Sequence, residues 1–177
     1  MDKKELRAQI RALKRAMTEE QIVQSSARLG ELFVQTDQYK QAKTIYGYLP
    51  YNQEVRTVPM LEQALRDGKK VAVPKCYGDE MRFIYMDDLS KVEAGYANIP
   101  EPIADDPVAD DKTALVLMPG MAFTKNGDRM GYGGGFYDKF LAAEPDHPTV
   151  ALCYAFQMVE SLPTEEYDIP VDCVLWA

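Results

Sequence analysis

The chain has 177 residues, 46% of them hydrophobic and 27% charged, and a formal net charge of −8. This composition is typical of a globular protein and excludes a disordered tail, so we expect one domain over residues 1–177. The acidic charge argues against a nucleic-acid or membrane binder, and since neither a bilayer-length apolar run nor a secretory signal is found, we expect a soluble, cytoplasmic protein.

The N-terminal half is predicted to fold into helices joined to short strands. Apolar residues at helical spacing, beside a stripe of lysines and arginines, predict a helix over 2–17. Thr18 opens a second helix that runs toward Val34, because TEEQ has the pattern of a capping box. A β-rich run predicts a strand over Thr44–Leu49, and Thr57 can cap a third helix that the next glycine ends.

Further short strands follow in the second half of the chain. The expected strands are Lys70–Val73, Met81–Met86, Ala114–Met118, Thr149–Tyr154 and Cys173–Trp176. The stretch Gly95–Asp111 is rich in Pro and Asp and predicts a surface loop, and a fourth helix should end near Ala143. Helices that alternate with short apolar strands indicate the α/β class, a layered, Rossmann-like architecture with a mainly parallel sheet flanked by helices.

Cysteine and histidine usage restricts the chemistry. The three cysteines, Cys76, Cys153 and Cys173, lack CxxC spacing, which favours reduced, buried thiols. His147 is the only histidine, so a histidine-rich zinc site or an HExxH helix is impossible. A metal would therefore be a hard ion held by carboxylates, and magnesium fits best.

The most informative segment is MPGMAFTKNGDRMGYGGGFYDKFL, residues 118–141, which follows the strongest predicted strand and runs into a helix. Four closely spaced glycines near its centre let the backbone approach a ligand, so that successive N–H groups can converge on oxyanions. They are Gly131, Gly133, Gly134 and Gly135. The helix that follows adds its N-terminal dipole, so the segment is typical of a phosphate-binding loop.

The residues that flank the glycines favour a ligand over a plain turn. Arg129 lies just upstream, where a planar guanidinium can hold a phosphate through two N–H groups. The segment is neither a Walker A loop nor a GxGxxG fingerprint. The alternative is a tight strand-to-helix turn without a ligand, and four glycines in five positions between Arg129 and Asp138 make it the weaker interpretation.

At this segment the chain resembles the 5-formyltetrahydrofolate cyclo-ligases, also called 5,10-methenyltetrahydrofolate synthetases. DRMGYGGGFYDKFL, preceded by MPGMAF, is similar to the family signature, with Met130 in place of the usual Leu and Thr124 where Asp is common. The basic helix KKELRAQIRALKR, the segment GYLPYNQEVRT, the strand end VAVPK and the tail LPTEEYDIPVD also match. In that tail, Tyr167 stands where the family usually has His.

The resemblance implies an enzyme that uses ATP to close 5-formyltetrahydrofolate to 5,10-methenyltetrahydrofolate, with release of ADP and phosphate. The formamide oxygen attacks the γ-phosphoryl group to give an imidoyl phosphate, N10 then closes the ring on the activated carbon, and phosphate departs. Such transfer depends mainly on positioning and charge neutralisation, so it needs no histidine.

The resemblance also implies which residues bind the nucleotide. The loop residues are Arg129, Gly131, Tyr132, Gly133, Gly134, Gly135, Phe136 and Tyr137, with Arg129 and Tyr137 as the catalytic candidates. On the first helix, Lys3, Lys4 and Arg7 become ATP contacts by the same resemblance. From the residues alone, a solvated basic face is the better interpretation of that helix.

For the folate, the resemblance implies contacts from Leu49 and Glu54 and from the loop residues 132–136. A carboxylate at position 54 suits the N–H donors of a reduced pterin, although an exposed loop acid is the alternative. Asp138 and Asp168 resemble a pair of magnesium ligands. Their alternatives are a first-turn carboxylate that favours the helix dipole and a turn residue before a proline.

Two other functions remain open without the resemblance. A sugar-phosphate isomerase or CoA-transferase type of enzyme shares the layered architecture and the anion loop, but would need neither ATP nor the two aspartates. A non-catalytic nucleotide or folate sensor would keep the pocket and lose turnover. We expect small-molecule partners, reduced folate and ATP, and a monomer or weak oligomer. The sequence assigns no role to Arg11, Lys14, Lys75 and Tyr167.

Overall fold

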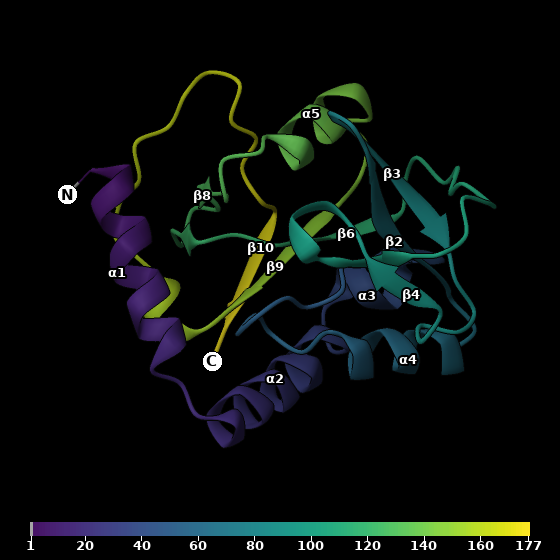
Figure 1. Ribbon diagram of the computed structural model, residues 1–177, viewed down its shortest axis with the longest axis horizontal. Coiled ribbons are helices and arrows are strands. Elements are labelled where there is room, and N and C mark those ends of the chain that lie inside the picture. The colour runs from purple at the N-terminus through teal and green to yellow at the C-terminus, as the bar shows by residue number, and fades with distance from the viewer. Residues whose placement is uncertain (1) are drawn as a thin grey trace.

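The computed structural model describes residues 2–177 and is built on a six-stranded sheet (Figure 1). The strand order is β10-β9-β6-β1-β2-β3, and all neighbours are parallel except β2 and β3. The strands are β1 Thr44–Tyr46, β2 Lys70–Tyr77, β3 Glu80–Tyr85, β6 Leu115–Met118, β9 Thr149–Cys153 and β10 Cys173–Trp176. The predicted α/β class with a mainly parallel sheet is therefore confirmed.

Helices cover both faces of this sheet (Figure 1). They are α1 Lys3–Arg15, α2 Glu19–Phe33, α3 Asp37–Gln41, α4 Val58–Arg66 and α5 Phe136–Ala143. α2, α3 and α4 pack on one face, where Leu29, Tyr39 and Leu61 share a buried cluster with Ile45 of β1. α5 packs on the other face through Leu141. Because both faces are covered, β6 and β9 are buried along their whole lengths, as their apolar sequences predict.

α1 lies outside these layers, against a small hairpin (Figure 1). The hairpin pairs β7, Ala122–Phe123, with β8, Arg129–Met130. The buried residues that join α1 to it form a separate cluster, which we call the α1 cluster. They are Ile10, Met121, Ala122 and Met130. The α1 cluster holds the first helix beside the segment that connects β6 to α5.

Local capping explains where the first two helices begin. The Asp2 side chain accepts a hydrogen bond from the backbone N–H of Glu5, and the Glu5 side chain accepts one in return, which opens α1. The predicted box of Thr18 and Gln21 opens α2 in the same way and is confirmed. Thr57 is the N-cap residue of α4, as predicted, but its hydroxyl makes no capping hydrogen bond and donates to the Tyr48 carbonyl instead.

The first strand is shorter than predicted, and the second is longer. β1 ends at Tyr46, because the chain turns over α4 at Gly47, where a Cβ would lie 2.6 Å from the Leu61 side chain. β2 extends beyond Val73 to Tyr77, since its second half pairs with β3.

Some small elements were not predicted. Gly95–Asp111 contains a turn at Tyr96–Asn98 and β5, Pro100–Pro102, which pairs with β4, Val92–Ala94. The helix α3 and the hairpin β7–β8 also lack a sequence pattern long enough to predict them. Among residues 2–177, no helix has the length and apolar character required to cross a bilayer.

Candidate active site

The candidate site lies where β1 and β6 end, at the point where the strand order reverses. From β1 the sheet continues through β2 toward one edge, and from β6 it continues through β9 toward the other edge. In open α/β sheets, ligands usually bind at this place, outside the carboxyl ends of the strands where the strand order reverses. Here the loop after β1 supplies Glu54, and residues 131–135, which we call the glycine loop, supply Tyr132. The Tyr132 hydroxyl donates to the Glu54 carboxylate at 3.1 Å.

The glycine loop has the backbone that its sequence predicts. Gly133 and Gly135 have φ values of +105° and +71°. Residues that carry a side chain rarely adopt such positive φ values. Gly135 is the N-cap of α5, and no side chain caps that end of the helix. The first N–H groups of α5 are therefore not occupied by a capping side chain, which suits an anion.

Arg129 is buried behind this loop rather than extended into solvent. Its side chain is 6% exposed and donates from Nη1 to the Pro119 carbonyl at 3.2 Å, while Nη2 lies 3.3 Å from Asp138 Oδ1. A Cβ at Gly131 would lie 2.9 Å from Nη1, so the glycine makes room for the guanidinium. Among the groups that the structure describes, nothing accepts a hydrogen bond from the buried Nε. A buried donor of this kind normally has a partner, which leaves a place for an acceptor on a ligand or water.

The two aspartates that resemble metal ligands are already engaged. Asp138 pairs with Arg129, and Asp168 accepts a hydrogen bond from the Glu165 N–H at 2.7 Å, which closes a turn. Within residues 2–177, no group of three or more His, Cys, Asp or Glu side chains is arranged to hold a metal. Ile169, next to Asp168, packs in the same cluster as Tyr137, next to Asp138.

Glu54 lies among tyrosines and is held by two donors. Its Oε1 accepts from the Tyr51 N–H at 2.8 Å, and its Oε2 accepts from Tyr132. Burial raises the pKa of Glu54, and the Lys14 ammonium opposes that rise. Leu49, the other predicted folate residue, is buried in the core beside Tyr48.

The first helix reaches the loop through Arg7, one of the three residues that the resemblance implies, and through Lys14, to which the sequence assigns no role. Arg7 donates from Nε to the Gly131 carbonyl at 3.4 Å, whereas Lys4 is exposed and Lys3 is partly exposed. Lys14 is buried, and its ammonium donates to the Tyr132 hydroxyl at 3.1 Å. A signal for Lys14 was present in the sequence, because it follows Ile10 by four residues and so shares the buried face of the helix.

Other residues considered from the sequence are used elsewhere. Lys75 is buried, but it pairs with Asp105 at 3.1 Å and donates to the Ile103 carbonyl. The side chain of His147 is fully buried, with Nδ1 2.7 Å from the Ala114 carbonyl oxygen at the start of β6. Tyr167 is 72% exposed.

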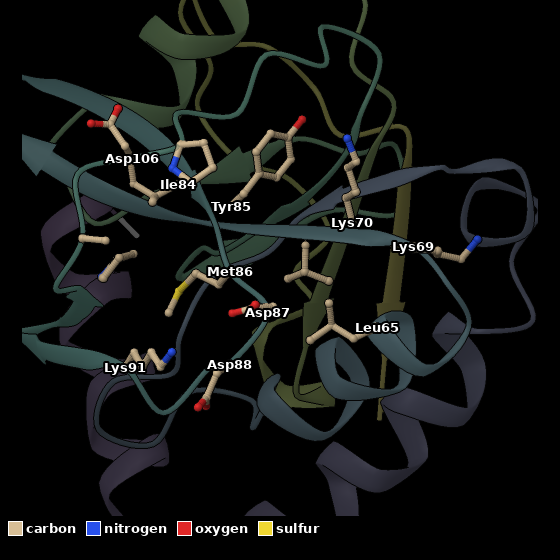
Figure 2. A pocket seen from close by; sticks show the side chains of 14 residues that line it. Leu65, Lys69, Lys70, Ile84, Tyr85, Met86, Asp87, Asp88, Lys91 and Asp106 are labelled. Carbon is tan, nitrogen blue, oxygen red and sulfur yellow. The ribbon is translucent and has the colours of Figure 1, made fainter.

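A separate cavity of about 540 Å³ lies at the opposite end of the sheet, near the start of β2 and the end of β3 (Figure 2). None of the residues predicted for the site lines it. Lys69 and Lys91 lie on opposite sides of the view, and the Lys69 ammonium is bound to the Ala42 carbonyl. Because its lysines and aspartates do not converge, this cavity indicates no class of ligand.

Comparisons with known proteins agree along the whole chain. A sequence model of the 5-formyltetrahydrofolate cyclo-ligase family matches residues 1–177. The chain is 31% identical to 5-formyltetrahydrofolate cyclo-ligase of Escherichia coli K12, over 94% of this chain and 95% of that protein. It is 27% identical to the mouse (Mus musculus) enzyme of the same name, over 98% and 93%.

Solved structures give the same match. The solution NMR structure of 5,10-methenyltetrahydrofolate synthetase from Aquifex aeolicus has a TM-score of 0.86 at 28% identity and covers 99% of this chain and 90% of that one. The synthetase of Mycoplasma pneumoniae has a TM-score of 0.78 at 23% identity and covers 98% of each chain, which supports the fold.

Proposed function

This chain belongs to the 5-formyltetrahydrofolate cyclo-ligase family, and we propose that it couples the closure of its folate substrate to the hydrolysis of ATP, with magnesium. Membership makes it an enzyme that converts 5-formyltetrahydrofolate to 5,10-methenyltetrahydrofolate. The use of ATP and magnesium and the course of the reaction are the proposed part.

The observation that supports this proposal is the hydrogen bond between Tyr132 and Glu54. Tyr132 belongs to the glycine loop, which we propose binds the phosphates, and Glu54 lies on the proposed folate side. A formyl oxygen can attack a γ-phosphoryl group only if the two substrates lie side by side. The contact between the loop and Glu54 supports the proposal that the nucleotide and the folate bind next to each other.

In the proposed reaction, the formyl oxygen of the folate bonds to the γ-phosphorus and ADP leaves. N10 then bonds to the activated formyl carbon and loses its proton, and the C–O bond breaks to release phosphate. The loop N–H groups and Arg129 would neutralise charge on the transferring phosphoryl group. Glu54 would accept hydrogen bonds from the pterin, and Leu49 would border the ring.

Asp138 and Asp168 fit magnesium through their oxygen chemistry, because carboxylates are the side chains that this hard ion prefers. Magnesium is commonly bound by one or two carboxylates together with substrate phosphates, so two aspartates suffice. The ion would supply charge neutralisation at the phosphates. Asp138 would then leave its pairing with Arg129. Asp138 would contact the ion, and Arg129 would contact the phosphates.

We further propose that the protein acts in the cytoplasm as a monomer or weak oligomer. Cys76, Cys153 and Cys173 are free thiols, which suits a reducing compartment.

The test is the appearance of methenyltetrahydrofolate absorbance from 5-formyltetrahydrofolate, with ATP and magnesium omitted in turn. We expect product only when both are present, with one ADP formed per product. Product formed without ATP would contradict the ATP coupling. Tight folate binding without product under all conditions would support the sensor instead.

A further inference from the structure

We propose that Lys14 and Tyr132 are positioning residues that hold Glu54 as an oriented acceptor for the pterin ring of the folate. This inference rests on the proposed folate-binding role of Glu54. It assigns a function to Lys14, which lies on α1, and to the hydroxyl of Tyr132, in addition to the phosphate contacts of the glycine loop.

The three side chains form a continuous chain of hydrogen bonds between distant segments. The Lys14 ammonium lies 3.1 Å from the Tyr132 hydroxyl, which lies 3.1 Å from Glu54 Oε2. The same ammonium lies 5.5 Å from the centre of the Tyr132 ring. α1, the loop after β1 and the glycine loop are thus joined at one carboxylate.

The chemistry of the three groups fixes the direction of both bonds. An ammonium can only donate, and an ionised carboxylate can only accept. The single proton of the Tyr132 hydroxyl therefore points to Glu54, because the Lys14 ammonium occupies an acceptor lone pair of the same oxygen. Without Lys14, the Tyr132 hydroxyl can still donate to the carboxylate, but its oxygen loses the donor that holds it in one position.

Glu54 is consequently fixed at both oxygens while it keeps acceptor capacity. Oε1 receives the Tyr51 N–H, and Oε2 receives the Tyr132 hydroxyl. A carboxylate has about four lone-pair sites, so two are left for N–H donors. The amide and amino edge of a reduced pterin presents two such donors side by side, and a carboxylate held in one orientation can meet both.

The charges around Glu54 make Lys14 its principal cationic neighbour. The groups that face Glu54 from other elements are Lys14 on α1, Tyr48 after β1, Tyr132 in the glycine loop, Tyr137 on α5 and Tyr154 after β9. Burial raises the pKa of Glu54, and Lys14 is the largest influence that lowers it. Burial lowers the pKa of Lys14, and Arg11 adds to that effect, whereas Glu54 and Cys153 raise it.

The test compares Lys14→Met and Tyr132→Phe with wild-type protein. Methionine keeps the apolar stem of Lys14, and phenylalanine keeps the ring of Tyr132. We expect the KM for 5-formyltetrahydrofolate to rise at least about tenfold in each variant, since each loses a hydrogen bond tied to a charged group. In Lys14→Met, the KM for ATP should stay within about twofold.

The pH profile separates positioning from simple packing. Without Lys14 the pKa of Glu54 rises, so the acid limb of kcat/KM for the folate should move to higher pH in Lys14→Met. Lys14→Arg should restore the wild-type limb, because arginine is also a donor with a fixed positive charge.

The chain contains a matched control outside the site. Lys69 lies 4.6 Å from the Tyr39 ring, and the Tyr39 hydroxyl donates to Asp67, which repeats the lysine–tyrosine–carboxylate arrangement. Lys69→Met and Tyr39→Phe should leave the folate KM and the acid limb unchanged.

Calorimetric binding of 5-formyltetrahydrofolate without ATP separates this inference from the proposed reaction. Weaker folate binding in Lys14→Met and Tyr132→Phe supports positioning, whether or not turnover depends on ATP. Wild-type folate affinity in both folded variants, or an unmoved acid limb in Lys14→Met, would overturn it. If Lys14→Met does not fold, Tyr132→Phe decides, because its ring is 46% exposed and the change removes only the hydroxyl.

Discussion

The Arg129 side chain is buried, and its Nε has no acceptor among the described groups. Substituting Arg129 should therefore affect both stability and turnover. Arg129→Met keeps part of the stem but leaves Asp138 and the Pro119 carbonyl without their partner. We expect turnover to fall at least ~100-fold, because preorganised charge at the phosphoryl group is lost. The melting temperature should fall as well, since a buried ion pair is broken by removing one member. Steady-state kinetics with thermal unfolding measure both, and near wild-type turnover would remove Arg129 from the chemistry.

Asp138 pairs with Arg129, and we propose that it also binds magnesium. If it binds magnesium, Asp138→Asn should strongly raise the magnesium concentration needed for activity, because an amide lacks the charge that a hard cation requires. Asp168→Asn should act in the same direction, and the double variant should be less than additive. The metal assignment would be contradicted if Asp138→Asn lowered turnover without changing the magnesium titration and Asp168→Asn had no effect. The role of Asp138 would then be its pairing with Arg129 alone.

At the scale of elements, local patterns predicted what local interactions determine. The box of Thr18 and Gln21 starts α2, and apolar runs became the buried strands. The buried face of α1 was harder, because Leu13 fits the apolar stripe yet is 41% exposed. Lys14 follows Ile10 by four residues and shares its buried face, but helical periodicity does not predict its contact with Tyr132, 118 residues away.

The basic residues of α1 have two competing interpretations: they bind ATP, or they form a solvated face without a ligand. If Lys3 and Arg7 contact ATP, the Lys3→Ala, Arg7→Ala double variant should weaken nucleotide affinity and leave folate affinity largely intact. The loss should shrink as salt rises, because exposed charge contacts are screened. Nucleotide titrations at two ionic strengths provide the measurement. Arg15→Ala, exposed at the end of the same helix, is the control, and equal small effects would identify a solvated face.

The β7–β8 hairpin depends on one close backbone approach. Gly127 has φ +93°, a Cβ there would lie 2.1 Å from the Val171 carbonyl oxygen, and the Val171 N–H donates to the Gly127 carbonyl. Gly127→Ala should therefore lower the free energy of unfolding by more than the ~1–3 kcal/mol of backbone strain alone.

Gly78→Ala is the matched control for that prediction. Gly78 also has positive φ, +66°, but a Cβ there would meet nothing within 4 Å. Denaturant unfolding of both variants isolates the cost of the close approach. Equal losses would show that Val171 moves aside freely.

Across the whole molecule, the sequence suggests candidate site residues but does not predict how they are arranged. The glycine loop follows β6 and Glu54 follows β1, and only the strand order makes these two strands neighbours. The contact between Tyr132 and Glu54 spans 78 residues, and the pairing of Arg129 with Asp138 depends on the loop that brings α5 back over β8. Such contacts follow from tertiary packing, which short motifs do not specify.

The attachment of α1 has a consequence for how the molecule opens. α2, α3 and α4 share the large core, but α1 is held by the α1 cluster and by side chains at the glycine loop. α1 should therefore detach in local fluctuations that leave the rest folded, and its amide hydrogens should exchange faster than those of α2. A nucleotide that touches both α1 and the loop would bind only the closed form. At a concentration one hundred times its Kd, the nucleotide should raise the free energy of opening of α1, measured by hydrogen exchange, by about 2.7 kcal/mol. The free energy of opening of α2 should stay unchanged.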